Sequence, residues 1–205
     1  LAVNALRDAQ GDIHGYIGFA YDITERRRTE AYVRRLAHHD TLTGLPNRLL
    51  LSERFQRSVE RSKRSGLRTA LIMLDLDHFK GLNDQYGHDF GDQALQAVAS
   101  LLAGSCRAGD LSARWGGEEF LLLLPETALG EAHALAERLR QAIQAIALRA
   151  GEQPVSLSCS CGVVQRTEQE QLEHLINHAD RLLYAAKQSG RNRVVAADPA
   201  QPACT

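Results

Sequence analysis

A pair of glycines followed by two glutamates stands in the middle of the 205-residue chain. Gly116 and Gly117 separate two short apolar runs, which predicts a β-hairpin with its turn at the glycines. Glu118 and Glu119 come directly after that turn, where the absence of glycine side chains lets a ligand approach the backbone closely. The hairpin alone is equally compatible with a plain surface turn that exposes two glutamates.

Two further carboxylates follow an apolar run that is expected to form a buried strand. Asp75 and Asp77 come directly after residues 70–74, and residues two apart on a strand face the same side. If the hairpin lies beside this strand, three or four carboxylate oxygens converge, including those of Glu118 and Glu119. Converging hard oxygens without His or Cys select Mg²⁺ or Mn²⁺, which would stabilise charge on a nucleoside triphosphate during phosphoryl transfer.

Polar side chains that suit a nucleotide follow the same strand. Asn83 and Asp92 can hydrogen-bond a purine edge, and a carboxylate that pairs with N1–H and N2–H favours guanine over adenine. Lys80 is a candidate phosphate ligand. Lys187 and Arg191, near the end of the last long helix, complement the helix dipole when taken alone and become candidate phosphate ligands in this context.

The elements that must position these residues follow from periodicity and turn signals. From residue 47 on, the central β-α-β-β-α-β order is that of ferredoxin-like folds, so we expect an α+β sandwich with an antiparallel central sheet flanked by helices. Thr127 is the expected N-cap of the fourth helix. The expected helices are 24–38, 47–65, 91–104, 127–148 and 172–187, and the expected strands are 12–23, 70–74, 111–115, 120–124, 154–164 and 193–196.

Composition and charge exclude several classes of protein. Hydrophobic residues make up 44% of the chain and charged residues 24%, which is typical of a globular protein. The 24 Lys and Arg residues against 25 Asp and Glu leave no basic excess, so nucleic-acid binding is not expected. No apolar run approaches the roughly 20 residues of a membrane span, so no membrane contact is expected from this stretch.

The termini and cysteines add two expectations. Because the chain begins at Leu1 and its only methionine is Met73, we expect a piece of a longer protein, whose upstream part could carry a membrane anchor. The cysteines form no CxxC pair, and Cys159 and Cys161 alternate on an expected strand. Buried, reduced thiols in the cytoplasm are therefore expected rather than a zinc site.

Four ordered segments of the chain resemble the GGDEF family, the bacterial diguanylate cyclases. They cover about residues 38–197. They are Asp40–Arg48, the polar segment 75–92, the hairpin Arg114–Phe120 in its Glu-Glu form, and the closing segment Ala179–Val194. The resemblance implies a fold like the palm of nucleotidyl cyclases and polymerases.

The resemblance also implies a reaction in which two GTP become cyclic di-GMP and two pyrophosphates. Each subunit would hold one GTP, and the 3′-hydroxyl of one would attack the α-phosphorus of the other. The domain would therefore work as a head-to-head homodimer, because holding two reactants in line supplies much of the barrier reduction.

The resemblance assigns roles to residues at matching positions. Asp75, Glu118 and the Leu76 carbonyl would hold Mg²⁺ or Mn²⁺, and Glu118 would also accept the proton of the attacking hydroxyl. Glu119 would be a second catalytic carboxylate, on a second metal. The residues expected in the substrate site are Phe79, Lys80, Asn83, His88, Asp92, Gly116, Gly117, Lys187 and Arg191. Taken alone, His88 reads as a capping or core histidine.

An RxxD motif precedes the hairpin. Arg107 and Asp110 match the family's inhibitory motif, which binds product and halts the enzyme. Arg can take a phosphate or guanine edge with two bonds, and Asp can accept from guanine N1 and N2. Arg138 stands where an arginine from the facing domain is expected. The alternative is a surface Arg–Asp pair at a helix end.

The remaining segments complete the expected organisation. Residues 1–23 resemble the last part of a PAS sensor domain, 24–38 a signalling helix, and 39–197 the catalytic domain, with a disordered tail at 198–205. Two other functions stay open. One is a non-catalytic module that binds GTP or cyclic di-GMP, and the other is a palm enzyme with another substrate, against which Asn83 and Asp92 argue.

Overall fold

The computed structural model describes residues 2–19, 21–65, 68–167 and 170–197. The chain divides into two units, Leu1–Ala37 and His38–Thr205. The first unit contains a hairpin of β1 (Ala2–Arg7) and β2 (Ile13–Phe19), whose strands pair antiparallel, and all but the last residue of the helix α1 (Thr24–His38). The predicted helix at 24–38 is confirmed, whereas β1 was not predicted. The predicted tail at 198–205 lies outside the described residues.

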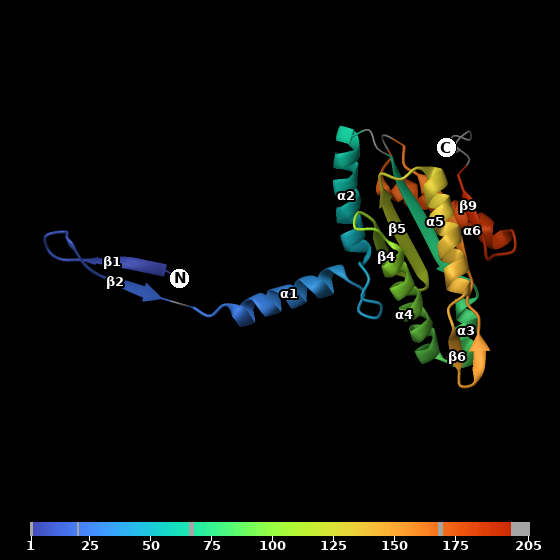
Figure 1. Ribbon diagram of the computed structural model, residues 1–205, viewed down its shortest axis with the longest axis horizontal. Coiled ribbons are helices and arrows are strands. Elements are labelled where there is room, and N and C mark those ends of the chain that lie inside the picture. Colours follow the sequence, from blue (N-terminus) through green and yellow to red (C-terminus); the bar gives the residue numbers. More distant parts are fainter. Residues whose placement is uncertain (1, 20, 66–67, 168–169, 198–205) are drawn as a thin grey trace. The chain divides into compact units, whose positions relative to one another are not determined.

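A mixed five-stranded sheet forms the centre of the second unit (Figure 1). The strands β4, β5, β3 and β8 pair antiparallel in that order, as a ferredoxin-like core requires, and β9 joins the edge parallel to β8. Because a helix connects β8 to β9, the chain returns to the same end of the sheet before β9 begins. Their bounds are β3 (Thr69–Leu76), β4 (Leu111–Gly116), β5 (Glu119–Pro125), β8 (Cys159–Gln165) and β9 (Val194–Ala196).

Helices cover both faces of this sheet (Figure 1). On β3, Ile72 and Leu74 point into the core shared with α4 (His88–Ser105) and α5 (Leu129–Gln144). Leu71 and Met73 point into the core under α2 (Arg48–Ser65) and α6 (Leu172–Gln188). Burial on both faces explains why β3 reads as a continuous apolar run rather than an alternating one.

Several elements differ from the predictions. The helix α3 (Phe79–Tyr86) precedes α4, and Gly87, at φ 87°, separates the two. The predicted helix 127–148 ends at Gln144, and the predicted strand 154–164 begins as β7 (Gln153–Val155) and resumes as β8. Both differences have one cause. Leu148 starts β6 (Leu148–Ala150) instead of continuing the helix, and β7 pairs with β6 across a turn at Gly151.

The cap of α5 also differs from the prediction. Its N-cap is Ala128, whose backbone N–H donates to Glu131 Oε2 at 2.9 Å. The Thr127 hydroxyl instead donates to the Pro125 carbonyl at 2.9 Å. Over the described ranges, none of the helices combines the length and apolar character that a membrane crossing requires.

Candidate active site at the hairpin turn

The hairpin lies beside the strand that carries Asp75, which meets the condition set for the carboxylates to converge. Strand pairing sets Asp75 directly opposite Glu119. One residue further on, the Leu76 N–H donates to the Glu118 carbonyl at 3.3 Å. The Asp75 carboxylate and the two glutamates therefore meet at one end of the sheet, where the turn at Gly116 and Gly117 closes the hairpin.

A lysine from another element completes this carboxylate cluster. Lys187, in the last turn of α6, places Nζ 2.9 Å from Asp75 Oδ2. Asp75 is only 5% exposed. Burial raises its pKa to about 6, with Lys187 opposing the rise and the charges of Glu118 and Glu119 adding to it. Burial also raises the pKa of Glu119, again against Lys187 and with Asp180 and Glu118 adding to the rise.

The donor set fits a hard divalent cation in chemistry. Asp75 and the two glutamates disfavour one another's charge, and an added cation relieves that repulsion. Their oxygens are ligands that Mg²⁺ and Mn²⁺ accept. In the part of the chain that the structure describes, no three His, Cys, Asp or Glu side chains form a group that could hold a metal by themselves.

Asp77 does not join the cluster, which corrects the expectation that it faces the same way as Asp75. Its Oδ1 accepts from the Ser160 hydroxyl at 2.8 Å, and its Oδ2 accepts from the Ser158 hydroxyl at 2.9 Å. Oδ2 also accepts from the Asn192 N–H at 3.0 Å. Because β3 ends at Leu76, strand alternation no longer applies at Asp77, which instead fastens the loop after α6.

The two glycines of the turn are required for different reasons. Gly117 has φ 52°, a left-handed conformation that favours glycine. At Gly116 the limit is space, because an ideal Cβ would lie 2.8 Å from Nη2 of Arg48. Arg48 stacks over the Trp115 ring, 4.5 Å from its centroid, and its Nε donates to the Trp115 carbonyl. Arg48 therefore lies in the space beside Gly116.

Sequence reasoning placed Arg48 in a motif but gave it no role in the site. The two residues of the Arg48–Trp115 hydrogen bond are 67 positions apart, so no local pattern signals it. Arg48 also lowers the pKa of Glu119, although its charge is a smaller influence there than burial. An open cleft of about 570 Å³ lies at this contact; it is lined by Asp40, Asn47, Arg48, Leu49, Arg114, Trp115, Gly116 and Gly117.

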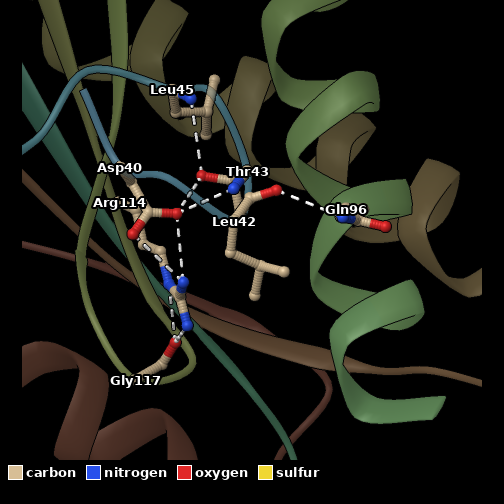
Figure 2. Close-up of polar contacts among 7 residues, drawn as sticks. All are labelled: Asp40, Leu42, Thr43, Leu45, Gln96, Arg114 and Gly117. Atoms are coloured by element: carbon tan, nitrogen blue, oxygen red, sulfur yellow. Dashed lines mark hydrogen bonds and ion pairs between the residues drawn. The ribbon is translucent and has the colours of Figure 1, made fainter. Parts of the chain in front are cut away.

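A second arginine, Arg114 of β4, connects the turn to the loop that precedes α2 (Figure 2). Arg114 donates to the Gly117 carbonyl from Nε at 3.0 Å and from Nη2 at 2.8 Å. Its Nη1 donates to Asp40 Oδ1 at 3.0 Å. The Thr43 N–H and hydroxyl donate to that same oxygen, at 2.8 and 2.6 Å. Burial alone would raise the pKa of Asp40, but the Thr43 hydrogen bonds and the Arg114 charge lower it below its usual value.

The same loop is fastened on its other side. Gln96 of α4 donates from Nε2 to the Leu42 carbonyl at 3.2 Å (Figure 2). The Leu45 N–H lies 3.4 Å from the Thr43 hydroxyl, and Leu45 itself is buried. The loop is thereby fixed between a helix of one layer and the turn that carries the two glutamates.

The predicted nucleotide residues after β3 lie on the helix pair α3 and α4. Phe79 is buried, and Lys80, His88 and Asp92 are exposed. Asn83 packs against Gly91, where an ideal Cβ would come within 1.9 Å of Asn83 Oδ1. Among the buried side-chain oxygens and nitrogens of the described residues, only this Oδ1 has no hydrogen-bond partner. This oxygen therefore lacks the hydrogen bond that buried polar groups normally make.

The two cations predicted at the end of α6 have different surroundings. Lys187 contacts Asp75, as described above. Arg191 lies in the turn after the helix at φ 62°, its side chain is exposed, and its N–H donates to the Ala186 carbonyl at 3.1 Å. The Asn192 bond to Asp77 fixes the backbone immediately beyond Arg191.

The RxxD motif forms an internal pair. Arg107 donates from Nε to Asp110 Oδ1 at 3.0 Å and from its backbone N–H to Oδ2 at 3.2 Å. Its Nη2 donates at 2.6 Å both to the Pro125 carbonyl and to the Thr127 hydroxyl. Arg138 is exposed on α5. The described hydrogen bonds of Arg107 do not include one to Arg138.

The chain is similar to curated proteins over most of its length. It is 45% identical over 161 residues to the diguanylate cyclase DgcP of Pseudomonas aeruginosa, covering 78% of this chain and 24% of that protein. It is 42% identical over 177 residues to the diguanylate cyclase VdcA of Vibrio cholerae, covering 85% of this chain and 51% of that protein. The chain thus spans about half, or less, of the length of these relatives.

The fold is similar to a solved structure that contains bound cyclic di-GMP. The coiled coil and GGDEF domain of DgcB from Caulobacter crescentus superposes with a TM-score of 0.81 at 32% identity, covering 86% of this chain and 94% of that one. Residues 37–193 also match the family described as diguanylate cyclase, GGDEF domain. With that match over three quarters of its length, and with the hairpin and its carboxylates placed as described, the chain belongs to the GGDEF family.

Proposed function

We propose that the domain is a diguanylate cyclase that condenses two GTP into cyclic di-GMP and two pyrophosphates. The observation that carries this proposal is the register that sets Asp75 opposite Glu119, with Glu118 beside them and Lys187 bonded to Asp75. These groups form an acidic cluster, with Asp75 buried and the two glutamates half-buried, at a turn whose backbone is fixed. Such a cluster suits a metal-bound triphosphate, and the named relatives are cyclases of this kind.

In this proposal each carboxylate has a role. Asp75, Glu118 and the Leu76 carbonyl would hold Mg²⁺ or Mn²⁺, which when bound supplies charge neutralisation to the phosphates. Glu118 accepts the proton of the attacking 3′-hydroxyl, and Glu119 acts as the second catalytic carboxylate. Lys187 neutralises Asp75 without the metal and is positioned to contact phosphate oxygens once substrate is present.

The guanine base would lie at the α3–α4 helix pair. The Oδ1 of Asn83, which has no hydrogen-bond partner among the described residues, would accept from a ligand N–H, and the exposed Asp92 carboxylate can accept from N1–H and N2–H. Adenine lacks that pair of donors, so these side chains favour GTP. The exposed cations Lys80 and Arg191, with His88, complete the substrate site, and Phe79 supports it from the core.

The organisation of the chain around this site is also a proposal. We assign residues 39–197 to the cyclase domain, 24–38 to a signalling helix, 1–23 to the end of a PAS sensor, and 198–205 to a tail. The antiparallel β1–β2 hairpin is compatible with the edge of a sensor sheet. Two copies of the domain must face each other, because each supplies one of the two GTP molecules.

A product-binding site is proposed at the RxxD motif. Arg107 and Asp110 offer the donors and acceptors that a guanine base needs, and the DgcB structure contains cyclic di-GMP. Arg138 would supply the arginine of the facing domain. Occupation of this site would halt turnover.

The proposed reaction is tested by incubating the purified chain with GTP and Mg²⁺ and detecting cyclic di-GMP by mass spectrometry. Glu118→Ala should abolish product, whereas the matched control Glu173→Ala, at an exposed glutamate of α6, should not. Bound GTP without product at high protein concentration would instead support a non-catalytic nucleotide-binding module. Full activity in Glu118→Ala would refute the assignment of the base.

A further inference from the structure

The arginine of the RxxD motif is engaged by the chain itself. Its Nε donates to Asp110, and its Nη2 donates to the Pro125 carbonyl and the Thr127 hydroxyl, both at 2.6 Å. These two acceptors lie 18 and 20 residues further along the chain, where β5 ends and α5 begins. Arg107 therefore ties the segment between α4 and β4 to the β5–α5 junction.

The geometry of a guanidinium makes this contact incompatible with two-bond recognition of a ligand. A guanidinium presents two donor edges for parallel hydrogen bonds, Nε–Nη2 and Nη1–Nη2. Both edges include Nη2, and its two hydrogens serve Pro125 and Thr127, with the Glu126 carbonyl at 3.5 Å as a weaker neighbour. A base or phosphate that takes Arg107 by either edge must first displace Nη2 from these acceptors.

The junction tolerates such a release. The Thr127 hydroxyl donates to the Pro125 carbonyl at 2.9 Å, so this carbonyl keeps a hydrogen bond when Arg107 leaves. The Arg107 side chain is 58% exposed, whereas that of Asp110 is 5% exposed. Arg107 can therefore turn toward a ligand while Asp110 stays in place. The bound and released states both leave the Pro125 carbonyl paired.

We propose that Thr127 and the Pro125 carbonyl compete with the guanine-containing product for Arg107, so that Thr127 sets the affinity of the inhibitory site. This inference rests on the proposed product site and deepens it. Without product, Arg107 braces the β5–α5 junction. With product, its Nη2 leaves the junction and binds the ligand.

The effect of Thr127→Val follows from two opposing losses. The variant removes a charge-assisted bond that holds Arg107 inward, which favours binding of product. It also removes the neutral donor that serves Pro125 after release, which opposes binding. Charge-assisted bonds are roughly twice as strong as neutral ones, so the first loss is larger. The dissociation constant for cyclic di-GMP should fall roughly fivefold, and the half-inhibiting concentration with it. Thr127→Ser keeps the hydroxyl and should match the wild type.

Calorimetric titration of the whole chain with cyclic di-GMP tests the inference, using wild type, Thr127→Val, Thr127→Ser and Arg107→Ala. Thermal unfolding of each variant establishes that it is folded. Tighter binding by Thr127→Val, with Thr127→Ser unchanged and Arg107→Ala impaired, is the expected result. Unchanged or weaker binding by Thr127→Val, with Arg107→Ala still impaired, would overturn the competition and leave the product site standing. Binding that survives Arg107→Ala, or no binding by wild type, would overturn the product site and the competition together.

Discussion

Replacing Gly116 with alanine should destabilise the protein because of Arg48. The new Cβ would lie 2.8 Å from Arg48 Nη2 and 3.7 Å from its Cζ, so the guanidinium must move away. Loss of its bond to the Trp115 carbonyl and of its place over the indole ring sets the upper limit of the cost of this movement. Gly116 is not among the glycines with positive φ, so its backbone accepts alanine without strain.

The magnitude follows from these contacts. A hydrogen bond from a charged donor contributes about 1.5–3 kcal/mol, and an exposed cation–π contact about 0.5–1 kcal/mol. Alanine regains about 0.4–1 kcal/mol by restricting the unfolded chain. Gly116→Ala should therefore lower the free energy of unfolding by up to about 3 kcal/mol. In an Arg48→Ala background it should be neutral or stabilising, which gives a coupling energy of up to about 4 kcal/mol between the two positions.

Equilibrium urea unfolding of the wild type, the two single variants and the double variant measures this coupling. Gly117→Ala is the matched control. Gly117 has φ 52°, so alanine there should be destabilising by about 1–2 kcal/mol whether or not Arg48 is present. Equal destabilisation by Gly116→Ala in both backgrounds would refute the steric argument. Loss of turnover without loss of stability would show instead that glycine is required at position 116 to make room for the nucleotide.

Three further predictions concern the contacts around the turn. Asp40→Asn should lower the free energy of unfolding by about 1–3 kcal/mol at pH 7, because the Arg114 charge loses its partner. Folding lowers the pKa of Asp40, so the stability that its carboxylate contributes is present above the unfolded pKa of about 3.9 and is lost as pH falls through the folded pKa. The free energies of unfolding of wild type and variant, measured in urea, should therefore converge in acid. Lys187→Met should weaken GTP affinity and stability together, because it leaves Asp75 buried without its cation; equilibrium dialysis and thermal unfolding would detect this, and an unchanged affinity would contradict it. Asp77→Ala should destabilise by about 2–4 kcal/mol through the loss of three bonds to a carboxylate, and amide exchange at Asn192 should rise; exchange at the wild-type rate would contradict it.

The sheet was predictable from the sequence because its signals are local. The apolar run before Asp75, the glycine pair and the last amphipathic helix each define an element within a few residues. Elements that lack such a signal were missed or merged with a neighbour. The strand β6 was not predicted, and β7 was merged with β8 into one expected strand, because β6 and β7 have three residues each and pair only with one another. The helix 127–148 was overextended because Leu148 continues an apolar pattern but belongs to that hairpin.

The carboxylates of the site were likewise predictable, whereas the groups that hold them were not. The placement of Asp75 beside the hairpin follows from two strands and one turn. Arg48 bonds the turn from 67 residues away and Arg114 bonds Asp40 from 74 residues away. Contacts between residues so far apart produce no periodic pattern in the sequence. The prediction that Asp77 faces the same side as Asp75 was wrong because β3 ends one residue before Asp77. Thr127 resembled a helix cap, but its hydroxyl serves Pro125 and Arg107 instead.

The turn owes its fixed position to backbone carbonyls rather than to its own side chains. The Trp115 carbonyl accepts from Arg48, the Gly117 carbonyl from Arg114, and the Glu118 carbonyl from the Leu76 N–H. Three of four consecutive peptide groups are thus held by partners from three different elements. Glu118 and Glu119 need such support, because burial and like charges act against the carboxylate forms of Asp75 and Glu119, and the cluster would spread apart on a loose loop. Holding the backbone leaves the carboxylate oxygens available to the metal and substrate of the proposed reaction, in which transfer between two nucleotides would require oriented groups.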